Sequence, residues 1–251
     1  GVGRYSATAT FISQEAAFTS AQAWTTKPSD PNAKASPTVV EINGRLYVLG
    51  FDQDAAGNQS SFVPRLSIFD PGTGSWSIGA SPAVVRAYAS AAAINGKLYV
   101  VGGCALANCQ SPTNQLEIYN PATNTWSPGT SMSIARFGAA AGGIGGKLYV
   151  SGGTTSCPVC VPTSTTEIYD PVANTWTTGA PIPVSRGLTA SAVLNGLLYV
   201  IGGYERNAAN TLAGAAVGTV SVYNPTANNW STRSSMPTAR SGAVAGAVNG
   251  T

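Results

Sequence analysis

Apolar residues along the chain gather in short runs, and turn-forming residues separate one run from the next. Typical runs are "LYVVGG" at residues 98–103 and "LEIYN" at residues 116–120. No segment keeps an apolar period near 3.6 residues, so the pattern favours β-strands over helices. Asn-Gly pairs such as Asn95-Gly96 stand between neighbouring runs, and both residues tolerate the positive φ of a tight hairpin turn. We therefore expect an all-β chain built from hairpins.

The runs repeat with a period of about fifty residues. The markers of the repeat are the leucine that opens "LYV" and the tryptophan that follows it: Leu46, Leu98, Leu148 and Leu198; Trp76, Trp126, Trp176 and Trp230. Each repeat contains four expected strands, which we call a to d: a strand of small residues, the "LYV" strand, a strand such as "EIYD" and the tryptophan strand. Four-stranded units that repeat at this length are typical of β-propeller blades. The small residues of strand a suit the narrow centre where blades converge.

A base stands in front of strand a in every repeat: Lys34, Arg86, Arg136, Arg186 and Arg240. The order of base, small-residue strand, "LYVxGG", "IYDP" and tryptophan resembles the kelch repeat, a family of β-propellers. The resemblance covers nearly the whole chain beyond residue 34, and it implies a single propeller domain over residues 1–251. The first repeat is more diverged, because it has Gly50-Phe51 in place of Gly-Gly and Phe69 in place of tyrosine.

The number of blades follows from the count of strands. Four blades are expected at residues 34–85, 86–135, 136–185 and 186–239. Further markers lie toward the two ends of the chain, namely Trp24 before the first blade and the small residues after Arg240. The simplest interpretation is a fifth blade assembled from residues 1–33 and 240–251. The alternative is a fragment of a longer propeller.

All four cysteines fall in the variable loops between strands b and c: Cys104, Cys109, Cys157 and Cys160. Local pairing within each loop would give two disulfides. One alternative is a four-thiolate zinc site between the two loops, since Cys-x-x-Cys is a common half-site. Another is a redox role for "CPVC", although the usual βαβ context is missing. We expect the disulfides and no metal, because a low-charge surface rich in Thr, Ser and Asn fits an extracytoplasmic setting where disulfides persist.

The five bases admit two interpretations. Arg86, Arg136, Arg186 and Arg240, with Lys34, could form a ring that binds a carboxylate or an acidic sugar. Alternatively, each base fixes its own loop, and recurrence in every repeat favours this role because ligand sites usually break repeat symmetry. Glu117 and Glu167 occupy equivalent strand c positions and are expected to be structural too. Other binding candidates lie off the repeat pattern in variable b–c loops: Asp52, Asp54, Tyr204, Glu205 and Arg206.

Composition narrows the range of partners. Charged residues make up 9% of the chain, and its 13 scattered bases exceed its 10 acids by only three, so nucleic acid is not expected as a partner. No apolar run approaches the roughly 18 residues of a membrane span. No secretion signal is visible at "GVGRYSATAT", and any signal is expected to have been cleaved. Histidine is absent, which removes the commonest general base and metal ligand, and no cofactor is expected.

We therefore expect a non-catalytic binding or structural module of a secreted or cell-surface protein. It would present the face that carries its b–c and d–a loops to a protein or a glycan. One alternative is a subunit of a surface appendage or assembly that exchanges terminal strands, because an incomplete blade leaves an edge open to strand addition. A second alternative is a carbohydrate-active enzyme of the kelch type, although no paired carboxylates stand out as acid and base.

Overall fold

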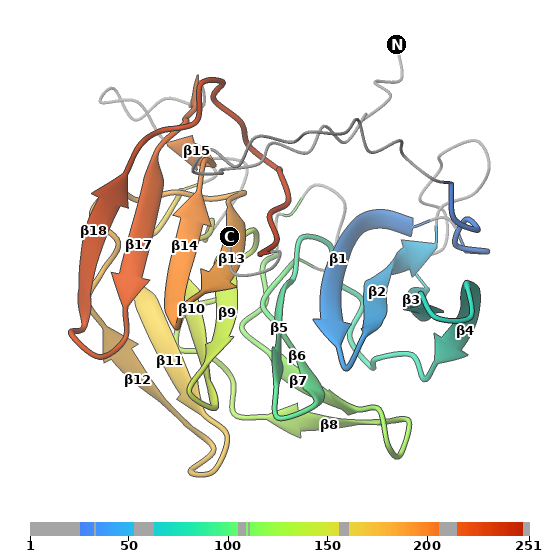
Figure 1. Ribbon diagram of the computed structural model, residues 1–251. Helices are drawn as coiled ribbons and strands as arrows, with labels where there is room; N and C mark the ends of the chain where they lie inside the picture. Colours follow the sequence, from blue (N-terminus) through green and yellow to red (C-terminus); the bar gives the residue numbers. More distant parts are fainter. Residues whose placement is uncertain are drawn as a thin grey trace.

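The computed structural model describes residues 26–32, 34–52, 63–104, 109, 111–155, 161–205 and 215–247 of the chain. These residues form four antiparallel sheets of four strands each, arranged around a common centre like the blades of a propeller (Figure 1). The expectation of an all-β propeller with four-stranded kelch-type blades is thus confirmed. Within the described part of the chain, no helix has the length and apolar character needed to cross a membrane.

Each blade takes its strands in chain order, from strand a at the centre to strand d at the rim. Blade 1 contains β1 (Lys34–Ile42), β2 (Arg45–Asp52), β3 (Pro64–Asp70) and β4 (Ser75–Gly79). Blade 2 contains β5 (Ser90–Ile94), β6 (Lys97–Val101), β7 (Leu116–Asn120) and β8 (Thr125–Gly129). Blade 3 contains β9 (Ala140–Ile144), β10 (Lys147–Ser151), β11 (Thr166–Asp170) and β12 (Thr175–Gly179). Blade 4 contains β13 (Ala190–Leu194), β14 (Leu197–Ile201), β17 (Val220–Asn224) and β18 (Asn229–Arg233), and its b–c loop adds a ribbon of β15 (Tyr204–Glu205) and β16 (Ala215–Ala216).

Small residues allow the four a strands to meet at the centre. Strands β1, β5, β9 and β13 contact their neighbours there. Ala140 of β9 is fully buried, and a Cβ on Gly143 would lie only 2.2 Å from the backbone oxygen of Ala93 in the next blade. At Gly143 even alanine would therefore force neighbouring blades apart, and at Ala140 a larger side chain would not fit the buried space. The sequence pattern of strand a thus has the steric cause that we expected.

Tyrosine and tryptophan fill the wider space between blades. Tyr99 of blade 2 packs against Tyr169 of blade 3 with ring centroids 6.2 Å apart, and Tyr169 in turn contacts Trp176 at 5.1 Å. The indole N–H of Trp176 donates to the backbone oxygen of Thr130, 2.7 Å away in the connection that leaves blade 2. The same bond recurs at the other blades, from Trp76 to Pro28, from Trp126 to Ala80 and from Trp230 to Ala180. Each tryptophan therefore fastens its blade to the connection that precedes it.

The glycine pair at the end of strand b permits a close backbone approach. A Cβ on Gly102 would lie 2.4 Å from the backbone oxygen of Arg136, and Gly103 has a φ of 94°. Gly103 N–H also donates to that Arg136 oxygen at 2.9 Å. A residue with a side chain would clash with the neighbouring connection and would be strained at this φ.

The predicted fifth blade concerns mainly residues outside the described part. Residues 1–25 and 248–251 are not described, and residues 234–247 form no strand in the structure. The assembly of a further blade from the two termini therefore stays a prediction.

Candidate functional site

The b–c and d–a connections lie together on one face of the propeller, which we call the loop face. The connection from blade 2 to blade 3 runs over the b–c loop of blade 2. There Arg136 N–H donates to the backbone oxygen of Thr113 at 3.2 Å, and Met132 N–H donates to that of Asn114 at 2.9 Å. Backbone hydrogen bonds therefore tie the described d–a connection to the described part of the b–c loop.

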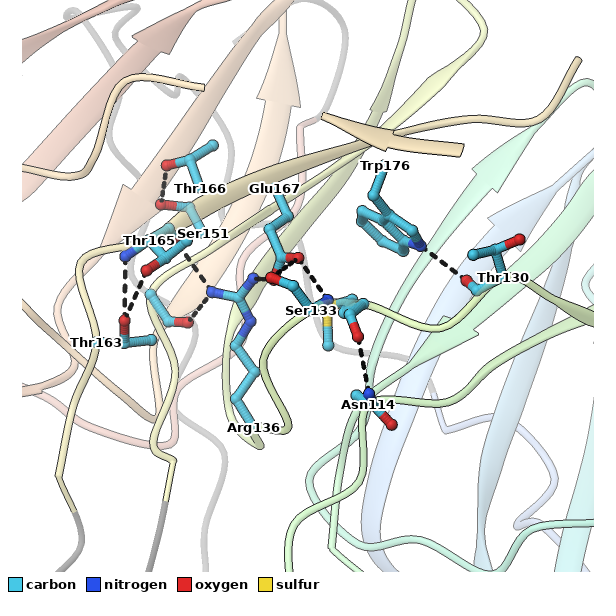
Figure 2. A network of polar contacts seen from close by, with 12 residues as sticks. Asn114, Thr130, Ser133, Arg136, Ser151, Thr163, Thr165, Thr166, Glu167 and Trp176 are labelled. Atoms are coloured by element: carbon cyan, nitrogen blue, oxygen red, sulfur yellow. Dashed lines mark hydrogen bonds and ion pairs between the residues drawn. The ribbon is translucent and has the colours of Figure 1, made fainter. Parts of the chain in front are cut away.

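Beneath the loop face of blade 3, Arg136 is buried and both of its Nη atoms are bonded, whereas its Nε has no hydrogen-bond partner within the described residues (Figure 2). Its Nη1 donates to the backbone oxygens of Gly152 at 3.1 Å and Thr165 at 2.8 Å, and its Nη2 forms an ion pair with Glu167. The other carboxylate oxygen of Glu167 accepts from the backbone N–H and the hydroxyl of Ser133, both at 2.7 Å. Burial lowers the pKa of Arg136, and the charge of Glu167 acts against that shift. We call this arrangement a clamp, because it joins strand c, the b–c loop and the d–a connection.

Blade 2 repeats the clamp closely. Arg86 Nη2 pairs with Glu117 at 2.6 Å, and its Nη1 donates to the backbone oxygens of Gln115 and Gly102. Glu117 also accepts from the backbone N–H of Ala83 at 2.9 Å. The structure thus gives Glu117 and Glu167 the structural role that their equivalent positions suggested.

Blades 1 and 4 have a serine where blades 2 and 3 have glutamate. In blade 4, Arg186 Nη2 donates to Ser221 Oγ at 2.5 Å, and the nearest carboxylate is Glu205 of the b–c loop, 3.8 Å from Nε. In blade 1, Lys34 Nζ donates to Ser67 at 2.5 Å and pairs with Asp30 at 2.6 Å. The bases at these two positions therefore obtain their counter-charge from outside strand c.

A proline accompanies each of these serines. Pro31 and Pro183 stand three residues before the base, at the position of Ala83 and Ser133. Proline has no N–H with which to satisfy the second oxygen of a buried glutamate. A glutamate on strand c would therefore leave a buried carboxylate oxygen without this donor in blades 1 and 4, and a serine avoids that cost.

The hypothesis of an anion-binding ring does not fit these positions. Arg86, Arg136 and Arg186 have relative exposures of 4%, 1% and 0%, and protein oxygens already accept from their Nη atoms. Their Nε atoms are also buried and have no hydrogen-bond partner within the described residues. The backbone of Arg240 is held like that of Arg136, through Val217 and Gly203. Its half-buried guanidinium forms no hydrogen bond or ion pair within the described residues. The structural interpretation therefore accounts for Lys34, Arg86, Arg136 and Arg186, whereas the role of the Arg240 side chain stays a prediction.

At the centre of the loop face, the residue two positions after each base has a positive φ. These residues, which we call the mouth, are Ser36 (46°), Tyr88 (52°), Gly138 (60°), Leu188 (51°) and Gly242 (64°). Backbone bonds link several of them around the centre, from Gly138 N–H to Tyr88 O and from Gly242 N–H to Leu188 O, both at 2.8 Å. A positive φ is unusual for a bulky residue, so Tyr88 and Leu188 are outliers. Tyr88 is also 41% exposed.

One wall of the mouth is apolar. Tyr88 contacts Phe137 with ring centroids 6.1 Å apart, and Phe137 is buried in a cluster with the disulfide Cys104–Cys109. That disulfide leaves neither of its sulfurs free as a thiolate ligand. Leu188 packs against the same cluster. The predicted local pairing is therefore present in the first loop, whereas Cys157 and Cys160 lie outside the described residues.

The next wall, at blades 3 and 4, is polar. Thr154 stands where blade 2 has Cys104, and Gly187 stands where Phe137 stands one blade earlier. A Cβ on Gly187 would lie 2.1 Å from Thr154 Oγ1, so this position requires glycine. In the described part of the chain, the buried hydroxyls of Thr154 and Thr189 have no hydrogen-bond partner. The mouth thus has two chemically different sides.

The remaining predicted site residues lie in the b–c loops of blades 1 and 4. Tyr204 and Glu205 form β15, where the backbone of Tyr204 bonds to that of Gly187. Asp52 is the last residue of β2, and its backbone stands opposite that of Lys34 in the β1–β2 register, whereas Asp54 and Arg206 lie outside the described residues. The mouth residues Tyr88 and Leu188 were missed. The glycines at the equivalent positions 138 and 242 were the signal, because they mark a place where φ is positive.

Comparisons with known proteins agree with this architecture. Residues 10–203 match the family model described as the KLHDC2/KLHL20/DRC7 Kelch-repeats domain, and residues 185–237 match the Kelch motif. No curated protein matches the chain. A solved structure described as "Structure of YjhT" is similar with a TM-score of 0.75 at 17% identity, over 91% of this chain and 78% of that one. At this identity the likeness concerns the fold alone. With most of its length matched by a kelch model, the chain belongs to the kelch-repeat family of β-propellers, a fold that supports a binding module.

Proposed function

We propose that this propeller is a non-catalytic binding module of a secreted or cell-surface protein, with its ligand seated over the mouth. Tyr88 is the observation that carries the proposal. A left-handed backbone costs a residue other than glycine roughly 1–2 kcal/mol, and Gly138 avoids that cost at the equivalent position. A large, exposed side chain at a strained position supports a role in binding rather than in folding.

The two walls of the mouth indicate the chemistry of the ligand. Tyr88 offers an aromatic surface for a flat apolar group, and Phe137 supports that ring from below. The hydroxyl groups of Thr154 and Thr189 make the other wall polar, but they are buried beneath its surface. A protein loop with an apolar side chain, or a glycan with one apolar ring face, would pack on Tyr88.

The proposed extracytoplasmic location has one structural support. Cys104 and Cys109 are joined as a disulfide close to the mouth. Disulfides persist in oxidising compartments and are rare where thiols are kept reduced. Both cysteines of the disulfide belong to the buried cluster of Phe137.

The proposal assigns no catalytic residue. The chain contains no histidine, and Glu117 and Glu167 are held by buried arginines and backbone N–H groups. Carboxylates in that state are poor candidates for proton transfer to a ligand on the surface. Hydrolysis or isomerisation of a sugar by the purified protein, lost on substitution of a mouth residue, would contradict this part of the proposal.

Binding of the wild type and of Tyr88→Gly to immobilised glycans and to purified extracellular proteins would test the proposal. We expect the wild type to bind at least one of these glycans or one of these proteins. The variant is expected to bind the same ligand at least about tenfold more weakly, which is about 1.4 kcal/mol. Val172→Ser is a matched control, because Val172 is 96% exposed and lies on a c–d turn at the opposite face. Equal binding by the wild type and Tyr88→Gly would contradict the proposal.

One observation favours self-association as a second candidate function. The b-strand tyrosines of blades 1 to 3 each contact a tyrosine of the following blade, at centroid distances of 6.1, 6.2 and 5.8 Å. Tyr199, at the same position in blade 4, is half-buried and contacts no other ring within the described residues. A further blade, from this chain or a second copy, would cover it. Light scattering decides between these two sources of the further blade. A concentration-dependent dimer supports a blade from a second copy, and a monomer at all concentrations excludes it.

A further inference from the structure

A groove of about 560 Å³ lies between blades 3 and 4, on the face opposite the loop face. Its lining comes from the a–b turns and the β17–β18 turn, and it includes Ile144, Lys147, Tyr149, Asn195, Leu197 and Asn224. A cleft of a few hundred cubic ångströms is the usual size of a small-molecule site. This groove is far from the mouth along the strands, and it is independent of the function proposed above.

A single departure from the repeat opens the groove. In blades 1 and 2, the asparagine of the a–b turn reaches toward the turn of the next blade. Asn43 Nδ2 lies 3.8 Å from the Cβ position of Gly96, and Asn95 Nδ2 lies 3.9 Å from that of Gly146. Blade 3 has Gly145 instead, and a Cβ there would meet nothing within 4 Å. The amide that spans the other two interfaces is therefore missing at this one.

A second departure makes the groove more apolar. The first residue of strand b is Arg45, Lys97 or Lys147 in blades 1 to 3, but it is Leu197 in blade 4. Leu197 lines the groove beside Ile144 and Pro225. An apolar surface thus replaces a cation at the place where the space is open.

Polar groups with free hydrogen-bonding capacity surround that surface. The Asn224 oxygen accepts from the backbone N–H groups of Thr226 and Ala227, which leaves its amide NH₂ directed to other partners. A tyrosine hydroxyl is protonated at neutral pH, and burial raises the pKa of Tyr149 further, so this hydroxyl can donate. Asn195 adds a second amide to the lining.

The charges of the groove indicate a neutral ligand. Of the described residues that line it, only Lys147 is charged, and its Nζ pairs with Asp170 at 3.1 Å. A ligand carboxylate would have to compete with Asp170 for this lysine. A neutral molecule with one apolar face and several hydroxyl groups matches the lining better, because amides and hydroxyls bind hydroxyls without a change in charge.

We propose that this groove binds a neutral hexopyranose ring, with the apolar face of the sugar on Leu197 and Ile144 and its hydroxyl groups toward Asn195, Asn224 and Tyr149. The site is separate from the mouth, so either one can exist without the other. The affinity expected for one shallow monosaccharide site is in the millimolar range, about −4 kcal/mol.

Gly145→Asn is the sharpest test, because it restores the residue of blades 1 and 2. Gly145 has a φ of 57°, and Asn43, Asn95 and Asn195 adopt 51°, 50° and 51° at the same turn position, so the variant is expected to fold. The probes are the methyl glycosides of glucose, galactose, mannose and N-acetylglucosamine, each titrated by nuclear magnetic resonance. We expect at least one to bind the wild type, and Gly145→Asn to weaken that binding at least tenfold.

Two controls keep this test separate from the mouth. Asn95→Gly changes the same kind of turn at the neighbouring interface and is expected to leave the binding unchanged. Tyr88→Gly reports on the mouth: glycoside binding that is lost in Tyr88→Gly and retained in Gly145→Asn would place the sugar at the mouth and overturn the groove proposal. Unchanged binding in Gly145→Asn, or no binding of any of the four glycosides by the folded wild type up to roughly 20 mM, would overturn the proposal.

Discussion

Blades 3 and 4 hold an equivalent buried arginine in different ways. In blade 3, Glu167 is buried at 2% exposure and accepts from both Arg136 and Ser133. In blade 4, a serine takes the place of the glutamate, and Glu205 approaches Arg186 from a loop with its side chain 25% exposed. The first arrangement is closed to solvent, whereas the second connects a buried charge to the root of a long variable loop.

The difference shows how a repeat can vary without loss of its fold. Both arginines keep their bonds to the two backbone oxygens at the ends of strands b and c. What changes is the source of the negative charge, and that change follows from Pro183, which cannot donate to a glutamate. The backbone contacts of the buried arginine are thus regular, while the buried residue that faces its Nη2 differs between the blades.

Removal of the buried carboxylate in blade 3 is expected to have the largest effect. Glu167→Gln leaves the charge of Arg136 uncompensated in a buried site, which typically costs about 3 kcal/mol or more. Ser221→Ala in blade 4 removes a single hydrogen bond to Arg186 and is expected to cost about 1–2 kcal/mol. Urea denaturation of both variants measures the two losses. Equal losses would show that the two clamps do not differ as described.

Conversion of blade 4 to the blade 3 pattern is expected to fail unless the proline is replaced as well. Ser221→Glu alone adds a larger side chain and a carboxylate oxygen without its backbone donor, which is expected to destabilise the fold by about 1–3 kcal/mol. Pro183→Ala in the same chain supplies an N–H and is expected to recover about 1 kcal/mol of that loss. If Pro183→Ala lowers the stability of the Ser221→Glu variant further, our account of the paired proline and serine is contradicted.

Neutralisation of the loop carboxylate in blade 4 is expected to have a smaller effect. Glu205 is partly exposed and lies 3.8 Å from Arg186 Nε, so solvent screens the interaction. Glu205→Gln should therefore change the free energy of unfolding by less than about 1 kcal/mol. A loss of stability as large as that of Glu167→Gln would show that Glu205 contributes as much as Glu167, which contradicts this expectation.

The smallest expected effect concerns the c–d turn of blade 3 and depends on pH. Backbone donation from Ala173, followed by Lys147 and the N–H of Val172, holds the pKa of Asp170 below its ordinary value. The ionised turn therefore stabilises the folded state above about pH 4, and this is lost as the pH falls through the lowered pKa.

Asp170→Asn should remove that acid dependence and keep the turn, because Asn120 and Asn224 make the corresponding bonds in blades 2 and 4. Unfolding free energies measured from neutral pH down into acid should fall less steeply in the variant. An unchanged slope would show that Asp170 does not contribute.

Much of the fold was predictable from the sequence, because it depends on features that repeat. The "LYV" strands, the Asn-Gly turns and the tryptophans recur about every fifty residues. Four expected strands in each repeat identify four-stranded blades. The equivalent strand c positions of Glu117 and Glu167 likewise indicated a structural role. The local pairing of Cys104 with Cys109 followed from their place in one loop.

The candidate site was harder to predict because it depends on backbone angles and on empty space. Tyr88 looks ordinary in the sequence, and its importance appears only when its φ is compared with that of Gly138. The opening at Gly145 depends on where Asn43 and Asn95 point in the other blades. The link between Pro183 and Ser221 is visible in the sequence, but its meaning requires the geometry of Arg186.

The central claim is that Tyr88 binds the ligand and that its positive φ costs backbone strain. The most direct test measures ligand binding and the free energy of unfolding for Tyr88→Gly in one preparation. Relief of the strain, about 1–2 kcal/mol, should offset the lost ring contact with Phe137, about 0.5–1.5 kcal/mol. We predict stability within about 1 kcal/mol of the wild type and binding lost at the loop face. A clear loss of stability with unchanged binding would contradict the claim and make Tyr88 a packing residue.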